Sequence, residues 1–255
     1  LSLQSRSDRW SFELWSVPEG YEKDRHLHAQ GELVRTSGGP PGKLDVSAIL
    51  ARCARTESAE RCYADFDKVG LNYGPAFRAI RELRFGDGEA VARLSLPDAL
   101  RQQEHRFVLH PSLLDGALQA IAGLLMTANG SGSRLYVPYS LMELEQYGAV
   151  GAEVIAHVTP GDDASRTHEA FRAFNIVLAD ASGVVLARMK GLVVKEVGPA
   201  MKSARRDDRR QDGSATTVLL RPCWTPQGLS ALEAGESDRS RSTVECTLVL
   251  SRGGG

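Results

Sequence analysis

The stretch from residue 111 to residue 128, PSLLDGALQAIAGLLMTA, constrains the fold more than any other part of the chain. Its apolar side chains recur at helical spacing and cover much of the circumference, which predicts one long, largely buried helix. Pro111 suits the first helical turn, where the missing backbone N–H is not needed, and Asn129 and Gly130 favour an end there. The apolar face is built by Leu114, Ala117, Leu118, Ile121, Leu124 and Leu125.

Segments with strand character lie on both sides of this helix in the sequence. Before it, residues 79–85 and 90–96 alternate between apolar and polar side chains and are joined by GDGE, a hairpin signal. After it, the segments with strand composition are 136–148, 152–160, 168–180 and 183–197, the last two joined by DASG. This pattern predicts an α+β fold in which an antiparallel sheet wraps around one long helix.

The remaining segments suggest how the chain is organised. Residues 1–35 alternate with the period of two that a half-buried sheet requires, and the Gly- and Pro-rich residues 36–45 predict a loop. Residues 46–64 have a mild helical spacing. Residues 198–216 are highly charged and predict a solvated linker. Residues 217–255 contain apolar runs that resemble the first strands of a different module.

Composition narrows the function classes. The chain has 255 residues, 42% of them hydrophobic, and a net charge of −1, so it offers neither a nucleic-acid surface nor a polybasic membrane patch. No apolar run approaches the roughly 20 residues of a membrane span, and no signal peptide is recognisable. Both ends read as positions inside a longer polypeptide. The four cysteines are Cys53, Cys62, Cys223 and Cys246. Their spacing argues against a zinc site and a disulfide framework, so we expect reduced thiols in the cytoplasm.

Asp115 and Gln119 are the sharpest candidates for chemistry. They are four residues apart, so they share one helical face about one turn from each other. A carboxyl group among leucines and alanines has its pKa raised by desolvation and can act as a general acid, with Gln119 orienting it. The alternative is that both residues lie on the solvated face of an ordinary helix. His110 is expected to position the start of the helix.

The segment NYGPAF is a second feature, because Gly74 before Pro75 imposes a tight, extended turn. On physical grounds this turn places Tyr73 and Phe77 in a core. A substrate-binding role for Tyr73 is the alternative.

Together these segments resemble the dehydratase domain of modular polyketide synthases. GLNYGPAF is similar to that family's YGPxF motif, and LHPSLLDGALQA is similar to its HPxLLDxxxQ motif. YVPYSLMELEQYG, with Val137 and Pro138 at its start, resembles the LPxxxxxxxxxG region that follows. The resemblance covers roughly residues 1–197. It implies a double hotdog fold, in which each half is a sheet around a long helix, and it identifies most of this chain as the second half.

The resemblance also implies an activity: removal of water from a β-hydroxyacyl thioester carried on the phosphopantetheine arm of an acyl carrier protein. Asp115 would assist departure of the hydroxyl group, with Gln119 as its helper. It implies no cofactor of the chain's own and no metal, neighbouring synthase domains as partners, and a homodimer in the full synthase. The residues expected to bind substrate are Tyr73, Gly74, Pro75, Phe77, His110, Pro111 and Pro138.

The sequence departs from the family pattern in one respect. The family's catalytic histidine belongs to an HxxxGxxxxP motif of the first half, and no such motif occurs here. His26 and His28 lack that spacing; with Ala29 and Gly31 they resemble the last strand of the first half instead. We therefore expect little or no dehydration from this chain alone.

The expected organisation follows from these matches. The open alternatives for the function are a non-catalytic domain, a domain repurposed to form pyran rings or shift double bonds, and a structural thioester-binding hotdog module. The expected segments are 1–45, the tail of the first hotdog and the linker between halves; 46–197, the second hotdog; 198–216, a linker; and 217–255, the start of a ketoreductase-like structural subdomain.

Overall fold

The computed structural model describes most of the chain up to Val197. The predicted linker at 198–216 and nearly all of the predicted module at 217–255 lie outside the described residues. The described ranges are 2–6, 9–16, 26–35, 39, 41–86, 88–129, 134–161, 170–197 and 246–250.

The described strands form one antiparallel sheet in the order β1-β2-β3-β11-β7-β10-β9-β8-β6-β5-β4. The strands are β1 (Ser2–Arg6), β2 (Arg9–Ser16), β3 (His26–Arg35), β4 (Arg55–Ser58), β5 (Ile80–Gly86), β6 (Glu89–Ser95), β7 (Leu135–Gln146), β8 (Glu153–Pro160), β9 (Phe171–Ala179), β10 (Val185–Val197) and β11 (Cys246–Leu250). The helices are α1 (Val46–Arg52), α2 (Ala59–Lys68), α3 (Pro111–Gln119) and α4 (Ala122–Asn129), with 3-10 turns η1 (Pro75–Phe77) and η2 (Asp98–Arg106).

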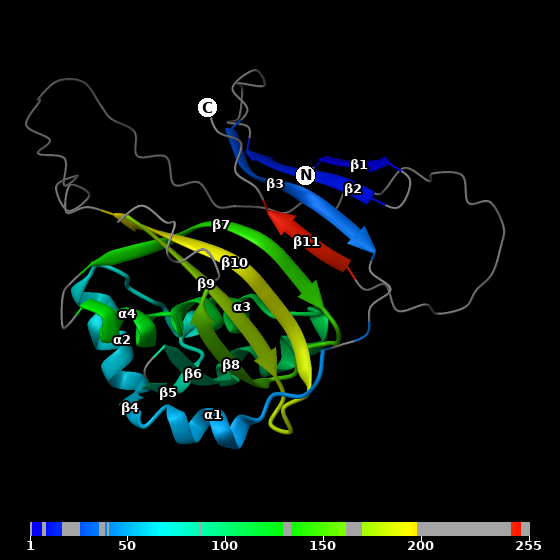
Figure 1. The fold of residues 1–255 in the computed structure, drawn as a ribbon. Coiled ribbons are helices and arrows are strands. Elements are labelled where there is room, and N and C mark those ends of the chain that lie inside the picture. Colours follow the sequence, from blue (N-terminus) through cyan, green and yellow to red (C-terminus); the bar gives the residue numbers. More distant parts are fainter. Residues whose placement is uncertain are drawn as a thin grey trace, which may run out of the picture. The chain divides into compact units, whose positions relative to one another are not determined.

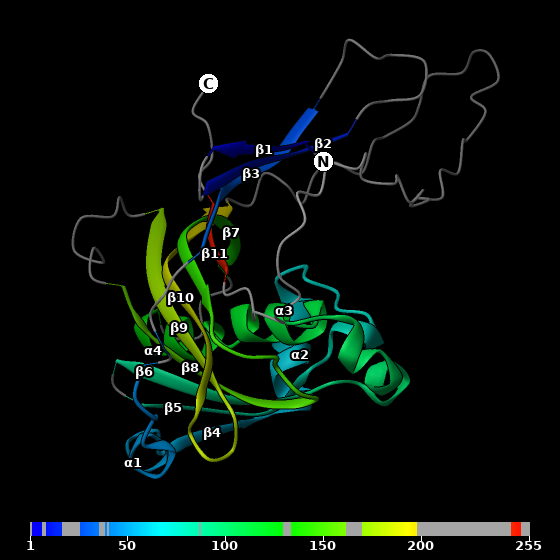
Figure 2. The same ribbon diagram turned by 90° about the vertical axis from the view of Figure 1, so that its right-hand side faces the viewer.

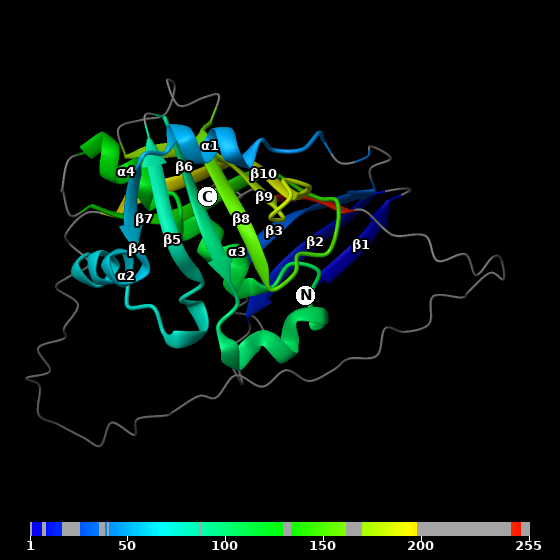
Figure 3. The same cartoon turned by 90° about the horizontal axis from the view of Figure 1, so that it is seen from below.

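The sheet from β7 to β4 curves around α3 and α4, as Figures 1 and 2 show. Seen from below in Figure 3, β4, β5, β6 and β8 lie side by side in that order beneath the helices. Leu113 and Ala117 of α3 are fully buried, in one core with Ile80 and Leu94 of the sheet. The predicted α+β architecture, an antiparallel sheet around a helical centre, is confirmed.

Both predicted hairpins are present. β5 pairs with β6 across the GDGE segment, and β9 pairs with β10 across residues 180–183. In the second turn the Asp180 carboxylate accepts hydrogen bonds from the backbone N–H groups of Ser182 and Val184, at 2.8 and 3.0 Å. Gly183 has φ +84°, and a Cβ there would lie 2.2 Å from the Leu44 carbonyl oxygen, so this turn needs glycine.

The prediction of one continuous helix over residues 111–128 is wrong at its centre. α3 ends at Gln119 and α4 begins at Ala122. Between them the Ile121 N–H bonds the Leu118 carbonyl at 3.2 Å, a three-residue spacing that tightens the last turn of α3. The apolar periodicity continues through the break, so the sequence pattern did not reveal it.

The single helical segment expected at residues 46–64 is also divided. α1 and α2 are separated by β4, which pairs antiparallel with β5. Cys53 at the end of α1 is buried, and Gly86 of β5 lies so near that a Cβ there would be 2.3 Å from the Arg52 carbonyl oxygen. Pairing with the sheet therefore overrides the weak helical preference of this stretch.

No single helix in the described ranges is long and apolar enough to span a membrane; residues 98–106 and 111–125, bent by 114° at the break between them, meet the length and composition criterion only as a pair.

Candidate active site

Asp115 is placed by the way α3 begins and packs. His110 caps the helix, since its Nδ1 accepts a hydrogen bond from the Ser112 backbone N–H at 3.2 Å, and Pro111 fills the first helical position. Gly116 lies against the sheet so closely that a Cβ there would be 3.0 Å from Ala79 Cβ. The glycine lets the buried face of α3 approach the sheet, and Asp115 then lies on a different face, beside a cavity.

Gln119 connects Asp115 to the surrounding backbone. Its side-chain Nε2 donates to Asp115 Oδ2 at 2.7 Å and to the Phe77 carbonyl oxygen at 2.9 Å. The Tyr63 hydroxyl lies 3.1 Å from Gln119 Oε1, and Gln119 is only 3% exposed. The predicted pairing of Asp115 with Gln119 is therefore present as a direct hydrogen bond, within a larger network.

The surroundings of Asp115 favour its protonated form. Burial raises the pKa of the carboxyl group, and the hydrogen bond from Gln119 opposes this only in part. Burial, and then the charge of Asp115, raise the pKa of the Tyr73 hydroxyl to about 12. A carboxyl group with a raised pKa beside a cavity is suited to general acid chemistry.

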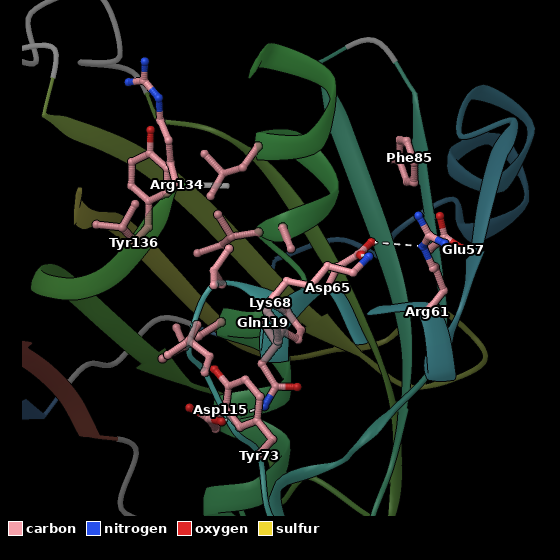
Figure 4. Close-up of a pocket in the computed structure, with 18 of the residues that line it drawn as sticks. Glu57, Arg61, Asp65, Lys68, Tyr73, Phe85, Asp115, Gln119, Arg134 and Tyr136 are labelled. Carbon is pink, nitrogen blue, oxygen red and sulfur yellow. Dashed lines mark hydrogen bonds and ion pairs between the residues drawn. The ribbon is translucent and has the colours of Figure 1, made fainter. Parts of the chain in front are cut away.

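Figure 4 shows Asp115, Tyr73 and Gln119 at one end of a cavity of about 490 Å³. The cavity continues along α3 and α4 to Leu125, between β7 on one side and α2 with β4 and β5 on the other. Leu125 lies in α4, ten positions after Asp115 of α3, so the cavity follows both helices across the break between them. The apolar side chains that line the cavity are Phe66, Val69, Leu71, Phe85, Leu118, Ile121, Ala122, Leu125 and Val194.

Charged side chains surround the outer parts of this cavity. On α2, Asp65 forms ion pairs with Arg61 at 3.3 Å and with Lys68 at 2.6 Å, and both cations are largely exposed. Arg134 pairs with Glu196 at 2.9 Å. In the described part of the chain, no group of three or more His, Cys, Asp or Glu residues could hold a metal ion.

The predicted site residues separate into two groups. The cavity is lined by Tyr73, Asp115, Gln119 and Pro138, which come from three separate segments of the sequence. The other predicted residues are not among those that line it: Gly74, Pro75, Phe77, His110 and Pro111.

Members of the second group are connected to Asp115 and Gln119 through the backbone. Gly74 and Pro75 begin the η1 turn, whose last residue, Phe77, presents its carbonyl oxygen to Gln119. Phe77 is 41% exposed, so the prediction that this turn places both aromatics in a core is wrong for Phe77, although Tyr73 does pack against the core. His110 and Pro111 set the start of α3. His110 Nε2 is buried without a hydrogen-bond partner.

Tyr63 was not recognised in the sequence. It lies on α2, 56 residues before Gln119, and it is 5% exposed. A tyrosine on the apolar side of a short helix is usually a core residue, so only the fold could connect it with Asp115.

Comparison with known proteins agrees with this architecture. The family model described as "Polyketide synthase dehydratase N-terminal domain" matches residues 41–204. The sheet-wrapped helix with a carboxyl group at its cavity is thus that of a hotdog dehydratase domain. The chain belongs to the polyketide synthase dehydratase family.

Relatives and solved structures point to the same class. Polyketide synthase PksN of Bacillus subtilis (strain 168) is 31% identical over 242 residues, which is 89% of this chain and 4% of the relative. Polyketide synthase PksM of the same organism is 30% identical over 240 residues, 92% of this chain and 6% of the relative. This chain therefore spans only a small fraction of the curated relatives it matches.

A trans-AT polyketide synthase dehydratase domain from Brevibacillus brevis is 33% identical, with a TM-score of 0.70 over 77% of this chain and 68% of that one. An inactive CurK dehydratase mutant with aspartate replaced by asparagine is 27% identical, with a TM-score of 0.67 over 77% of this chain and 67% of its own. A companion inactive mutant has histidine replaced by phenylalanine.

Proposed function

We propose that this chain is part of a dehydratase that converts a β-hydroxyacyl thioester on an acyl carrier protein into an α,β-enoyl thioester. The observation that carries the proposal is Asp115: a carboxyl group with a raised pKa, held by Gln119, at the end of an elongated, mainly apolar cavity. Tyr73 and Pro138 line the same cavity and are proposed to contact the substrate.

The proposed reaction uses Asp115 as the acid. A base removes the proton on the α carbon, the C–O bond at the β carbon breaks, and the electron pair of the C–H bond forms the α,β double bond. Asp115 gives its proton to the departing hydroxyl group, which leaves as water. The reaction is redox-neutral, so no cofactor of the chain's own is needed. The substrate arrives on the phosphopantetheine arm.

The base is proposed to be a histidine supplied by the rest of the dehydratase, as the resemblance implies. A CurK dehydratase with histidine replaced by phenylalanine is inactive, and one with aspartate replaced by asparagine is also inactive. Both support a mechanism that divides the work between two side chains. The 255-residue chain alone is therefore expected to have little activity.

We assign residues 46–197 to the second hotdog half. These residues contain the strands β4 to β10 and both central helices, which is the sheet around a helical centre that one hotdog half requires. Within a synthase, the proposed partners are the acyl carrier protein, neighbouring domains and a second copy of the chain, in the cytoplasm. Gly74, Pro75, Phe77, His110 and Pro111 are proposed to support the substrate site through the backbone contacts described above.

The test is dehydration of a β-hydroxyacyl carrier protein by the polyketide synthase module that carries this chain, followed by mass spectrometry. Asp115→Asn should abolish formation of the enoyl product while the circular dichroism spectrum stays unchanged. Asp98→Asn is the matched control, because the Asp98 side chain is 93% exposed and lies outside the cavity. Undiminished turnover by Asp115→Asn would rule out Asp115 as the acid.

Product analysis in the same assay separates the alternatives. A cyclic ether product would indicate a pyran-forming domain, and a β,γ-enoyl product from an α,β-enoyl substrate would indicate a double-bond shift. Substrate binding without any product, from the complete module, would indicate a structural thioester-binding domain. Each of these results would overturn the proposed dehydration.

A further inference from the structure

Tyr63 is packed tightly beside α3, the helix that carries Asp115 and Gln119. It lies on α2, which begins at the cap Ser58, whose side chain accepts a hydrogen bond from the Arg61 backbone N–H at 3.3 Å. The Tyr63 ring packs against Tyr73 with ring centroids 6.1 Å apart, and the Arg78 guanidinium lies 5.2 Å from its centroid. With 5% of its surface exposed, the side chain has little freedom to move its hydroxyl group.

The two hydrogen bonds of this hydroxyl group have a fixed direction. The Ile80 backbone N–H, which can only donate, lies 3.0 Å from the Tyr63 oxygen, so that oxygen accepts. The hydroxyl hydrogen is then available for Gln119 Oε1, 3.1 Å away. Buried polar groups pair wherever they can, because an unpaired one costs free energy, so Tyr63 donates to Gln119.

This direction decides which end of the Gln119 amide faces Asp115. With Oε1 engaged by Tyr63, the amide nitrogen points at Asp115 Oδ2 and the Phe77 carbonyl oxygen, at 2.7 and 2.9 Å. A flipped amide would bring its oxygen against both of these acceptors. The Ile80 N–H therefore sets the donor direction of the Tyr63 hydroxyl, and Tyr63 in turn sets which end of the Gln119 amide faces Asp115.

We propose that Tyr63 is a positioning residue for the reaction: it fixes the Gln119 amide so that an N–H always meets Asp115 Oδ2. This inference rests on the proposed role of Asp115 as the acid. Because Oδ2 accepts from Gln119, the proton that Asp115 delivers sits on Oδ1. Tyr63 thereby selects which carboxyl oxygen faces the substrate hydroxyl, although it touches no reacting atom itself.

Tyr63, rather than Tyr73 or the charged residues of the cavity, donates to the Gln119 amide oxygen. Tyr73 is the titratable side chain whose pKa responds to the charge of Asp115, but its backbone carbonyl, rather than its hydroxyl, is held by Arg78 at 2.9 Å. The pKa of Asp115 is set by burial and by Gln119. The charged residues that line the same cavity are Arg55, Glu57, Arg61, Asp65, Lys68 and Arg134.

The first experiment measures the pKa of Asp115 in the full chain by ¹³C NMR titration of its carboxyl carbon, in wild type and in Tyr63→Phe. Without the tyrosine hydroxyl, Gln119 Oε1 loses its donor, the amide is held less firmly, and its hydrogen bond to the Asp115 carboxylate is weakened. The titration midpoint of Asp115 should therefore move to higher pH. Tyr147→Phe is the matched control: its hydroxyl bonds Glu145, and the residue does not line the cavity.

The second experiment places the same change in the Gln119→Ala background. If Tyr63 acts through Gln119, Tyr63→Phe should cause no further shift of the Asp115 titration there. An equal shift in both backgrounds would show that Tyr63 acts on Asp115 by another route. An unchanged midpoint in Tyr63→Phe itself would also overturn the proposal.

Turnover in the complete module gives an independent measurement. Tyr63→Phe should lower kcat by roughly fivefold with little change in KM, the loss expected for one buried hydrogen bond of about 1 kcal/mol. The pH above which turnover falls should shift in Tyr63→Phe by the same amount as the Asp115 titration midpoint. If Tyr63 only stabilised the fold, the variant would lose thermal stability without this shift. If wild-type protein fails to dehydrate, the proposed function fails, but the titration still decides the role of Tyr63.

Discussion

Gln119 Nε2 donates a hydrogen bond to Asp115 Oδ2 at 2.7 Å, and this contact joins the only predicted acid to the buried backbone of the domain. Gln119 reaches the Phe77 carbonyl with the same nitrogen and Tyr63 with its oxygen. Both the nitrogen and the oxygen of its amide are therefore hydrogen-bonded to other groups of the protein. The residue is a structural component as well as a helper of Asp115, and its replacement should affect stability and activity together.

Gln119→Ala should reduce the free energy of unfolding by about 1–3 kcal/mol, because it removes the hydrogen bonds of the Gln119 amide to the Tyr63 hydroxyl and the Phe77 carbonyl. Denaturant unfolding measures this. Turnover should also fall. Gln146→Ala is the matched control, since Gln146 bonds the Leu186 carbonyl at 3.3 Å and does not line the cavity. It should retain full turnover; equal turnover in Gln119→Ala would contradict the role of Gln119.

Asp115→Asn should gain thermal stability at neutral and alkaline pH while losing activity. The folded protein raises the pKa of Asp115 above its ordinary value of 3.8, so the folded state binds this proton more tightly than the unfolded state. Stability from this group is complete below pH 3.8 and is lost as the pH rises through the folded pKa. Asparagine does not ionise and avoids that loss.

Melting temperatures of wild type and Asp115→Asn across the pH range test this sign. The advantage of the variant should be small below pH 3.8, grow between that value and the folded pKa, and then stay constant. A variant that becomes progressively less stable than wild type as the pH rises would show that the carboxylate is stabilised, not destabilised, by its site.

Ala122→Phe should shorten the range of acyl chains that are accepted. Ala122, the first residue of α4, lines the cavity seven positions after Asp115, so a larger side chain there should obstruct the part of the cavity along α4 and leave the end at Asp115 open. We expect kcat/KM for long β-hydroxyacyl substrates to fall roughly tenfold or more, the effect of a steric cost of 1–3 kcal/mol. Short substrates serve as the internal control. An equal loss for both lengths would place the acyl chain elsewhere.

Glu89→Gln should destabilise the domain without changing turnover. Glu89 is 9% exposed, accepts a hydrogen bond from Arg52 Nη2 at 3.0 Å, bonds His157 Nε2 at 2.7 Å, and connects α1 to the sheet. Losing these charged hydrogen bonds should cost about 1.5–3 kcal/mol in denaturant unfolding at pH 7. A change in kcat with unchanged stability would instead connect this cluster to the reaction.

The pH dependence of this cluster has the opposite sign to that of Asp115. Arg52, and after it His157, lower the pKa of Glu89 below its ordinary value of 4.5, so its contribution is present above that value. It is lost as the pH falls through the folded pKa. The stability difference between wild type and Glu89→Gln should therefore shrink on acidification below pH 4.5.

Much of the sheet could be predicted because its information is local. The hairpin turns at 86–89 and 180–183 carry glycines that adopt positive φ, and the strands beside them alternate clearly. The divided helix could not be predicted, because the apolar pattern runs without interruption from Leu118 through Ile121. The strand at β4 was missed for a similar reason: its four residues have no pattern of their own and are strands only because β5 is beside them.

The sequence alone determined the family resemblance, the sheet around a helical centre, and the pairing of Asp115 with Gln119, since residues four apart on a helix must share a face. Tertiary structure decided which residues surround that pair. It brought Tyr73 and Pro138 to the same cavity, gave Phe77 and His110 supporting positions, and placed Tyr63 beside Gln119. These contacts join segments tens of residues apart, and only packing of α2, α3 and the sheet fixes such distances.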